Sequence, residues 1–225
     1  MTTRPATLLA TLLLAGLVLT LGGCNIVGGL AGGMAASYER TGTRVVEAEY
    51  TRLAGEEWAV IVSADLGIQG EYPDLTLYLT AQVTKRLAEN NQTIAAKGYV
   101  PADRLLTHLY DNPRWVTKPR GELAKSLGVT RLVWIEVLDY RLNDPGNQYL
   151  WAGEASGTVS VIEADSPAPD EAAYSKSIRV RFPDSKGITQ AELTREAVMT
   201  ALAQRFVDRA SWLLYTHEEP NAIKY

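Results

Sequence analysis

The sequence predicts a mixed α/β fold of the α+β class, with a single mixed sheet and helices packed mainly on one of its faces. Two kinds of pattern predict it. Short runs that are continuously or alternately apolar indicate strands, and apolar residues that recur every three or four positions indicate helices. In chain order the elements read β-α-β-α-α-β-β-β-α. We place them in one domain over residues 37–225.

The first part of this domain combines a buried strand with an amphipathic helix. Residues 58–62 read WAVIV, a continuous apolar run with β-branched side chains that predicts a buried strand. Pro73 and Asp74 then open a helix with one apolar stripe. The stripe is formed by Leu75, Leu79, Val83 and Leu87. Residues 92–96 are expected to form a short second strand, which would complete a strand–helix–strand unit with a parallel crossover.

Two short helices and the strongest strand signal follow. One helix begins near Pro101, and the other begins near Pro119 and ends at Gly128, because glycine commonly terminates helices. Residues 130–140 then alternate apolar side chains, which predicts a long strand.

The remaining elements are an antiparallel pair of strands and a closing helix. Residues 151–163 and 174–182 each alternate apolar with polar side chains, which indicates one dry and one wet face. Thr189 and Glu192 match a capping box at the start of a long helix that ends near Tyr215. The tail from His217 is expected to be irregular.

The first 23 residues have the features of an export signal. Arg4 supplies a positive charge, residues 8–21 are apolar, and Gly23 is a small residue directly before Cys24. Cys24 is the one cysteine of the chain, so no disulfide can form within it. A thiol occupied by lipid would avoid the oxidation that a free thiol risks in the periplasm.

The four residues that end at Cys24, LGGC, resemble the lipobox of bacterial lipoproteins. This resemblance implies cleavage between Gly23 and Cys24 and lipid on Cys24, which would hold the protein on an envelope membrane. The alternative is a plain apolar anchor, but residues 6–23 are short for a membrane span. Residues 24–36 then form a glycine-rich tether. By the sorting rule of enteric lipoproteins, Asn25 favours the outer membrane, with the domain facing the periplasm.

Composition and motifs argue against several classes of function. The formal net charge of −4 and the pI near 5.3 do not suit a nucleic-acid surface, which needs clustered Lys and Arg. His108 and His217 have no neighbours at metal-ligand spacing. Phosphate-binding loops, dinucleotide-binding turns and nucleophile elbows are missing from the sequence. We therefore expect no catalytic residue, no metal and no cofactor.

The wet face of the two alternating strands is the surface that we expect to meet a partner. Its hydroxyl and arginine side chains are accompanied by the acidic residues of the loop that joins the strands. The candidate partner residues are Ser156, Thr158, Ser160, Arg179, Arg181, Asp165, Asp170 and Glu171. Two prolines in the loop limit its freedom, which lowers the cost of ordering it on binding.

The series of elements, with the lipobox before it, resembles an envelope group. The strand WAVIV, the helix at 75–87 and the segment LAKSLGVTRLVWI at 123–135 are similar in order to the N-terminal domain of TolB, curli-secretion lipoproteins and LpoB-type activators of peptidoglycan synthases. The resemblance implies a non-enzymatic role in docking or assembling other envelope proteins. Only Cys24 is carried over as a functional residue, and the oligomeric state stays open.

Two other functions remain as alternatives. The first is a periplasmic ligand-binding module whose cleft is lined by tryptophan, since the chain has five tryptophan residues. The second is an enzyme whose site would be assembled from scattered acids such as Asp65, Glu71 and Asp139.

Overall fold

The computed structural model describes residues 42–90 and 92–221. Cys24, the export signal and the tether lie outside the described residues. The described chain divides into two compact units, one made of residues 42–44 with 218–221 and a larger one spanning Val45–His217.

The smaller unit belongs to a two-stranded sheet. Strand β1 (Thr43–Val46) pairs with strand β6 (His217–Pro220), and Arg44 forms an ion pair with Glu219. The expectation of an irregular tail from His217 is therefore wrong. The sequence HEEP at 217–220 has no strand pattern of its own, and it becomes a strand because it meets a partner that lies far away in the chain.

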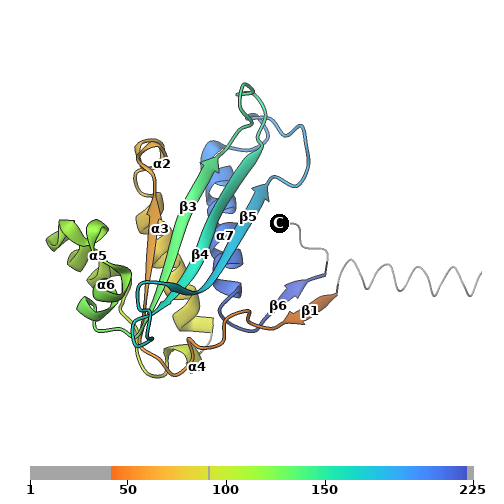
Figure 1. The fold of residues 1–225 in the computed structure, drawn as a ribbon. Coiled ribbons are helices and arrows are strands. Elements are labelled where there is room, and N and C mark those ends of the chain that lie inside the picture. Colours follow the sequence, from red (N-terminus) through yellow and green to blue (C-terminus); the bar gives the residue numbers. More distant parts are fainter. Residues whose placement is uncertain (1–41, 91, 222–225) are drawn as a thin grey trace, which may run out of the picture. The chain divides into compact units, whose positions relative to one another are not determined.

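The larger unit is built on a four-stranded mixed sheet, which confirms the predicted fold class. The strands are β2 (Trp58–Ala64), β3 (Arg131–Arg141), β4 (Gly153–Glu163) and β5 (Ala172–Phe182), in the spatial order β2-β3-β4-β5. Strands β2 and β3 run parallel, and the two other neighbouring pairs run antiparallel (Figure 1).

Two long helices cover one face of this sheet. Helix α3 (Leu75–Asn90) packs on β2, and helix α7 (Arg195–Trp212) packs on β4 and β5. Figure 1 shows both helices behind the strands. The predicted stripe of α3 is buried along its whole length, and it meets the alternating valine and isoleucine side chains of the strands in one core. Burial of this apolar area is the main force that holds the helices to the sheet.

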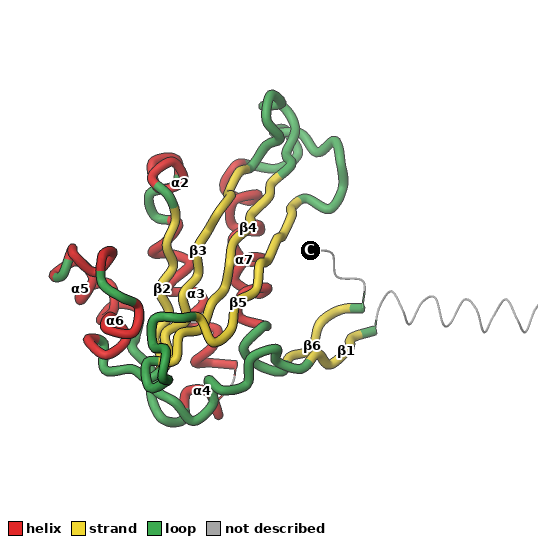
Figure 2. The backbone as a smooth tube through the Cα atoms, viewed as in Figure 1, coloured by secondary structure: helices red, strands yellow, loops and turns green. Residues whose placement is uncertain are grey.

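A smaller group of helices covers part of the other face. Helix α5 (Ala102–Asp111), the 3₁₀ helix η1 (Pro113–Thr117) and helix α6 (Arg120–Ser126) lie on this side. They form a second core in which Leu105 and Leu123 pack with Ile61, Leu132 and Ile162. In Figure 2, α5 and α6 lie beside β2, away from β5. Most of β4 and all of β5 therefore keep this face free of helices.

The predicted strand at residues 92–96 is wrong. Helix α2 (Leu66–Glu71) and α3 are followed by a further helical turn, α4 (Gln92–Ala95). The backbone oxygen of Ile94 accepts a hydrogen bond from the Trp58 indole nitrogen at 2.9 Å, and the Ile94 side chain is buried. A short apolar run fits a helix or a strand equally well, and here tertiary contacts decide. The parallel partner of β2 is β3.

The closing helix starts later than the capping box predicts. Thr189 and Glu192 do bond to each other, but α7 begins at Arg195, where Thr194 accepts a hydrogen bond from the backbone of Ala197 at 3.2 Å. Leu193 is held outside the helix because its carbonyl accepts a bond from the Trp151 indole at 2.8 Å. The bonds between Thr189 and Glu192 therefore stabilise a separate turn that precedes the helix.

Two glycines let α7 approach β4 closely. A Cβ atom at Gly157 would lie 2.5 Å from the carbonyl oxygen of Glu136 and 3.0 Å from the ring of Phe206. At Gly153 it would lie 2.6 Å from the carbonyl of Phe182 and 3.3 Å from Leu202. Glycine is therefore required at both positions, because any larger residue would push strand or helix away.

Replacing Phe206 with alanine should lower the free energy of unfolding by about 3–5 kcal/mol, since the ring is fully buried and its removal leaves a cavity. A chemical melt measures the loss. The matched control is Glu196→Ala on the exposed side of the same helix, which should change stability by no more than about 0.5 kcal/mol. Equal effects of both changes would contradict the packing of α7.

Candidate binding surface

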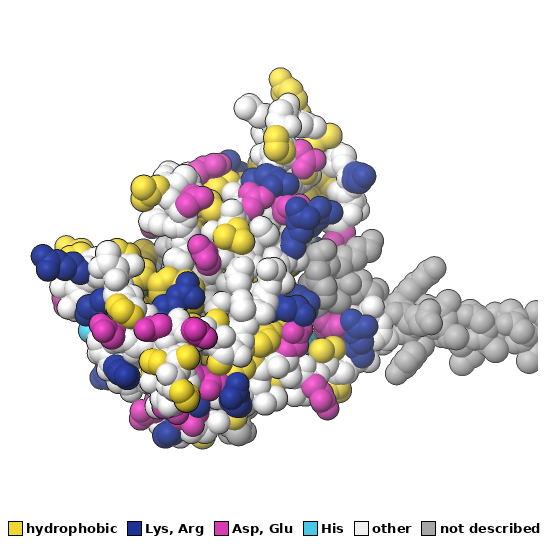
Figure 3. Space-filling view, viewed as in Figure 1, with side chains coloured by type: hydrophobic (Ala, Val, Ile, Leu, Met, Phe, Trp, Pro, Cys, Tyr) yellow, Lys and Arg dark blue, Asp and Glu magenta, His cyan; other side chains and the backbone are white. Residues whose placement is uncertain are grey.

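The predicted partner residues of β4 and β5 lie on the face that the helices leave free. In the register of the two strands Ser156 is opposite Arg179, and Glu154 is opposite Arg181. The two arginine side chains are 60% exposed, and those of Ser156 and Thr158 are half-buried. We call the polar side of residues 154–160 and 175–181 the open face. Figure 3 looks onto it.

Ser160 differs from its predicted role. Its side chain is buried, and its hydroxyl oxygen lies 3.2 Å from that of Ser175 on the neighbouring strand. The aromatic ring of Trp134, which is next to Ser160 in the register of β3 and β4, belongs to the second core. Ser160 therefore contributes to the edge of that core and is hardly accessible to a partner.

A buried carboxylate organises the arginines of the open face. Glu154 is 3% exposed, and its two oxygens accept hydrogen bonds from Nε of Arg179 at 2.8 Å and from Nε of Arg181 at 2.9 Å. Arg141 on β3 lies across from Glu154, and its Nη2 approaches the same carboxylate to 3.3 Å. Arg141 also pairs with Asp139. Three guanidinium groups thus surround one carboxylate, and we call this set the arginine cluster.

The arginines keep Glu154 ionised. Burial by itself would raise the pKa of Glu154, but the hydrogen bonds from Arg181 and Arg179 and the positive charge of Arg141 outweigh burial and lower the pKa below its usual value. The negative charge of Glu154 and that of Asp139 neutralise two of the three guanidinium groups. The cluster therefore retains positive charge.

A hollow of about 620 Å³ opens beside the cluster. Its walls come from the loop between β3 and β4 and from the loop between β5 and α7, which lie at the same end of the sheet (Figure 1). Figure 3 shows basic and acidic side chains together at this end. Lys186 lines the hollow and forms no ion pair with another residue that the structure describes. Asp184 also lines it, with its carboxylate held by Arg205 through two bonds of 2.7 Å.

The acidic loop between β4 and β5 is fastened to the molecule and does not project freely. Asp165 accepts a bond from Arg131 at 2.5 Å, and Asp170 accepts one from the backbone nitrogen of Gly121 at 3.0 Å. A Cβ atom at Gly121 would lie 2.7 Å from the carbonyl of Pro169, so the loop packs tightly on the first turn of α6. Glu171 remains exposed. Of the three acidic candidates, Asp165 and Asp170 thus have structural partners.

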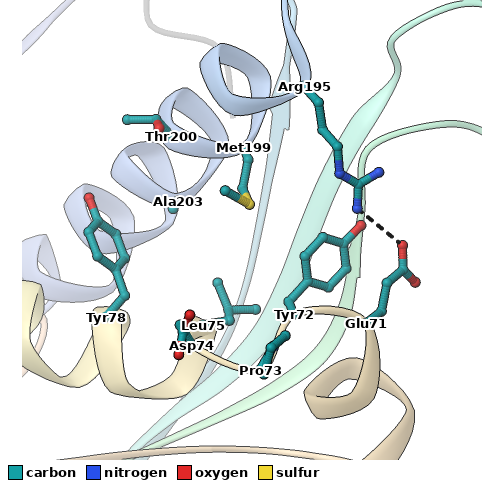
Figure 4. Close-up of a pocket in the computed structure, with 10 residues that line it drawn as sticks. All are labelled: Glu71, Tyr72, Pro73, Asp74, Leu75, Tyr78, Arg195, Met199, Thr200 and Ala203. Carbon is teal, nitrogen blue, oxygen red and sulfur yellow. Dashed lines mark ion pairs between the residues drawn. The ribbon is translucent and has the colours of Figure 1, made fainter.

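A second, smaller pocket of about 320 Å³ lies between the turn that precedes α3 and the start of α7 (Figure 4). Leu75, Met199 and Ala203 form its apolar wall. At its mouth Arg195 lies 3.8 Å from Glu71 in an ion pair. The pocket is large enough for a small apolar group.

The tryptophans do not form a cleft. Trp58 and Trp151 are buried in the main core, and Trp212 packs against the same core. Trp115 and Trp134 pack against the second core, with ring centroids 6.0 Å apart. Trp151 also borders the hollow. The alternative of a tryptophan-lined cleft therefore loses the feature on which it was based.

The scattered acids do not meet in one site. Asp65 caps α2 by accepting a bond from the backbone of Ile68 at 2.8 Å, Glu71 pairs with Arg195, and Asp139 pairs with Arg141.

Within residues 42–90 and 92–221, the structure shows no group of three or more His, Cys, Asp or Glu side chains that could hold a metal ion. The same residues contain no helix with the length and apolar character needed to cross a membrane.

Comparison with known proteins gives distant structural similarities. No family model and no curated protein sequence matches the chain. Lipoprotein GNA1162 from Neisseria meningitidis is 13% identical, with a TM-score of 0.44 over 68% of this chain and 96% of its own. The PelC dodecamer protein from Paraburkholderia phytofirmans is 12% identical, with a TM-score of 0.44 over 77% and 98%. Protein XCC0632 from Xanthomonas campestris is 13% identical, with a TM-score of 0.45 over 77% and 89%.

GNA1162, PelC and XCC0632 are too distant from this chain to assign it a family or a function. GNA1162 is named as a lipoprotein, and none of the three is named as a TolB domain, a curli-secretion lipoprotein or an LpoB-type activator. The finer resemblance to those groups stays a prediction.

Sequence reasoning identified Arg179 and Arg181 but missed Arg141 and Lys186. These two residues lie in other elements, and only the pairing of β3 with β4 and the path of the loop after β5 bring them to the cluster and the hollow. The available signal was Glu154, an acid in a row of Ser and Thr opposite two arginines.

Changing Glu154 to glutamine should make the free energy of unfolding less dependent on pH in the acid range. Because the pKa of Glu154 is lowered in the folded state, its stabilising effect is complete above its ordinary value of 4.5 and is lost as pH falls through the lowered value. Chemical melts over this pH range should therefore show a shallower loss of stability for Glu154→Gln than for the unchanged protein. Glu171→Gln, which removes an exposed carboxylate, is the control and should follow the unchanged protein. Parallel curves for all three proteins would contradict the role of the cluster.

Proposed function

We propose that the chain is a lipid-anchored envelope protein that docks other envelope components without catalysing a reaction. The open face is the docking surface, and the arginine cluster is its centre. The observation that carries the proposal is the hydrogen-bonded arrangement of Arg179 and Arg181 on the buried Glu154. Arginine is enriched in protein interfaces, where its planar group binds carboxylates through paired hydrogen bonds.

The cluster suits binding because its geometry exists before a partner arrives. Exposed arginine side chains lose conformational entropy when a partner fixes them, which weakens binding. Here Arg179 and Arg181 are already held by Glu154, and both stand on β5, which is paired with β4 along its length. Part of the ordering cost is therefore met during folding.

The same bonds make Glu154 a poor acid–base catalyst. General acid–base catalysis works best when the pKa of the group lies near the working pH. The pKa of Glu154 is lowered, and both of its oxygens already accept bonds from arginine. This supports a binding role for the cluster.

The location follows from the export signal. Lipid on Cys24 anchors the chain after cleavage behind Gly23, and Asn25 directs it to the outer membrane, where the domain faces the periplasm. The partners are then the membrane, through the lipid, and one or more envelope proteins. The chain takes no part in nucleic-acid binding and needs no metal or cofactor.

A second candidate function is the binding of a small apolar ligand in the pocket of Figure 4. Its apolar wall and the Arg195 side chain at its mouth favour a ligand with an apolar body and a negative end. Isothermal titration calorimetry with decanoate tests this idea, and Ala203→Phe, which fills the pocket, should abolish the binding. No heat of binding, or equal binding to the Ala203→Phe variant, would reject it.

Replacing Cys24 with serine should move the protein out of the membrane fraction or leave an uncut precursor, because serine cannot form the thioether. Fractionation of cells and detergent-phase partitioning measure the change. Thr20→Ser, within the apolar part of the signal, is the control and should leave the protein on the membrane. A protein that is still cleaved and still attached to the membrane after Cys24→Ser would contradict the lipid anchor.

A photo-crosslinking amino acid at Thr158, in the middle of the open face, should give a discrete adduct with one envelope protein in living cells. The same amino acid at Thr107, exposed on α5, is the control and should not give that adduct. Gel shifts and mass spectrometry identify the products. If the two positions give the same products, or Thr158 gives none, the open face is not the docking surface.

A further inference from the structure

We propose that the hollow beside the arginine cluster binds carboxylate side chains of an acidic segment in the docked protein. The inference rests on the proposed docking function and names the chemistry of the partner. It is argued from the unused hydrogen-bond donors in the hollow, from the charge around them and from the volume of the hollow.

Arg179 and Arg181 have hydrogen-bond donors that no other described residue uses. Arg181 uses Nε for Glu154, and neither of its Nη groups bonds to another described residue. Arg179 uses Nε and Nη2, which leaves Nη1. Both side chains are 60% exposed, so these donors can reach a ligand. Both groups bond to the same carboxylate and both line the hollow, so their free donors belong to one site.

The charged residues of the loops that line the hollow also favour the binding of an anion. Lys186 lines the hollow without an ion pair among the described residues, and the negative charge of Asp184 is neutralised by Arg205. Asp144 also borders the hollow and offsets one positive charge. Positive charge remains after that offset, because Arg179 and Arg181 share the single charge of Glu154.

The volume of the hollow argues for a chain segment over a small free ion. About 620 Å³ is much more than one carboxylate fills. Arg179 and Arg181 belong to both the open face and the hollow. A protein docked on the open face can therefore extend an acidic side chain into the hollow without a change in the sheet.

The test uses the full mature chain and a fluorescent peptide of alternating Glu and Ser, followed by fluorescence anisotropy. The peptide should bind, and its affinity should fall as salt rises, because the contacts are charged and solvent-accessible. A peptide with Gln in place of Glu should not bind. Arg179→Gln with Arg181→Gln should weaken binding about tenfold or more. Lys186→Gln, whose side chain holds no element of the fold together, should weaken it about threefold.

The matched control is Arg104→Gln with Arg114→Gln. These arginines are exposed on α5 and η1, so the pair removes the same charge from another surface and should leave binding within about twofold. Equal losses in both double variants would show a general charge effect and overturn the site. Failure of the Glu peptide to bind also overturns it. Tighter binding of an oligogalacturonate, or full competition by dilute inorganic phosphate, would overturn the choice of a protein segment.

The outcome is separable from that of the docking proposal. If the adduct at Thr158 forms but the Glu peptide does not bind, docking stands and this inference fails. If the peptide binds at Arg179 and Arg181 but no adduct forms, the docking proposal fails.

Discussion

The close approach of α7 to β4 is the constraint on which the rest of the structure depends. Without side chains at Gly153 and Gly157, the helix lies near enough for Phe206 to fill the centre of the core. Helices α3 and α7 therefore cover one face of the sheet, and the smaller helices cover the β2–β3 part of the other face together with the end of β4 at Ile162. What remains open on β4 and β5 is then free to carry polar side chains.

Local patterns predicted the parts of the fold in which one element buries its own periodic stripe. The helix from Leu75 and the three long strands were found because their apolar residues repeat with the period of the element. Residues 92–95 and 217–220 were missed because distant partners decide their structure: the indole of Trp58 in the first case and β1 in the second. The capping box was recognised correctly as a local motif, but Leu193 is held outside the helix by Trp151.

Only the part of the candidate site that depends on a local pattern could be predicted from the sequence. Alternation places Arg179 and Arg181 on the wet face, so the sequence alone identifies them. Their arrangement depends on two strand registers that bring Arg141 and Arg181 to either side of Glu154, and no pattern within one segment contains that information. The composition of the acidic loop suggested carboxylates without partners in the protein. In the structure Asp165 is bonded to Arg131, and Asp170 accepts a hydrogen bond from the backbone of Gly121.

The sharing of one carboxylate by three arginines makes the cluster unequal under mutation. Loss of any one arginine leaves Glu154 with two cationic neighbours, so its buried charge is still compensated. Loss of Glu154 leaves three positive groups facing one another at the end of the sheet, and they repel. The three substitutions at the rim of the cluster and the one at its centre therefore differ in cost: a single arginine can be exchanged at little cost, whereas exchange of Glu154 affects all three arginines at once.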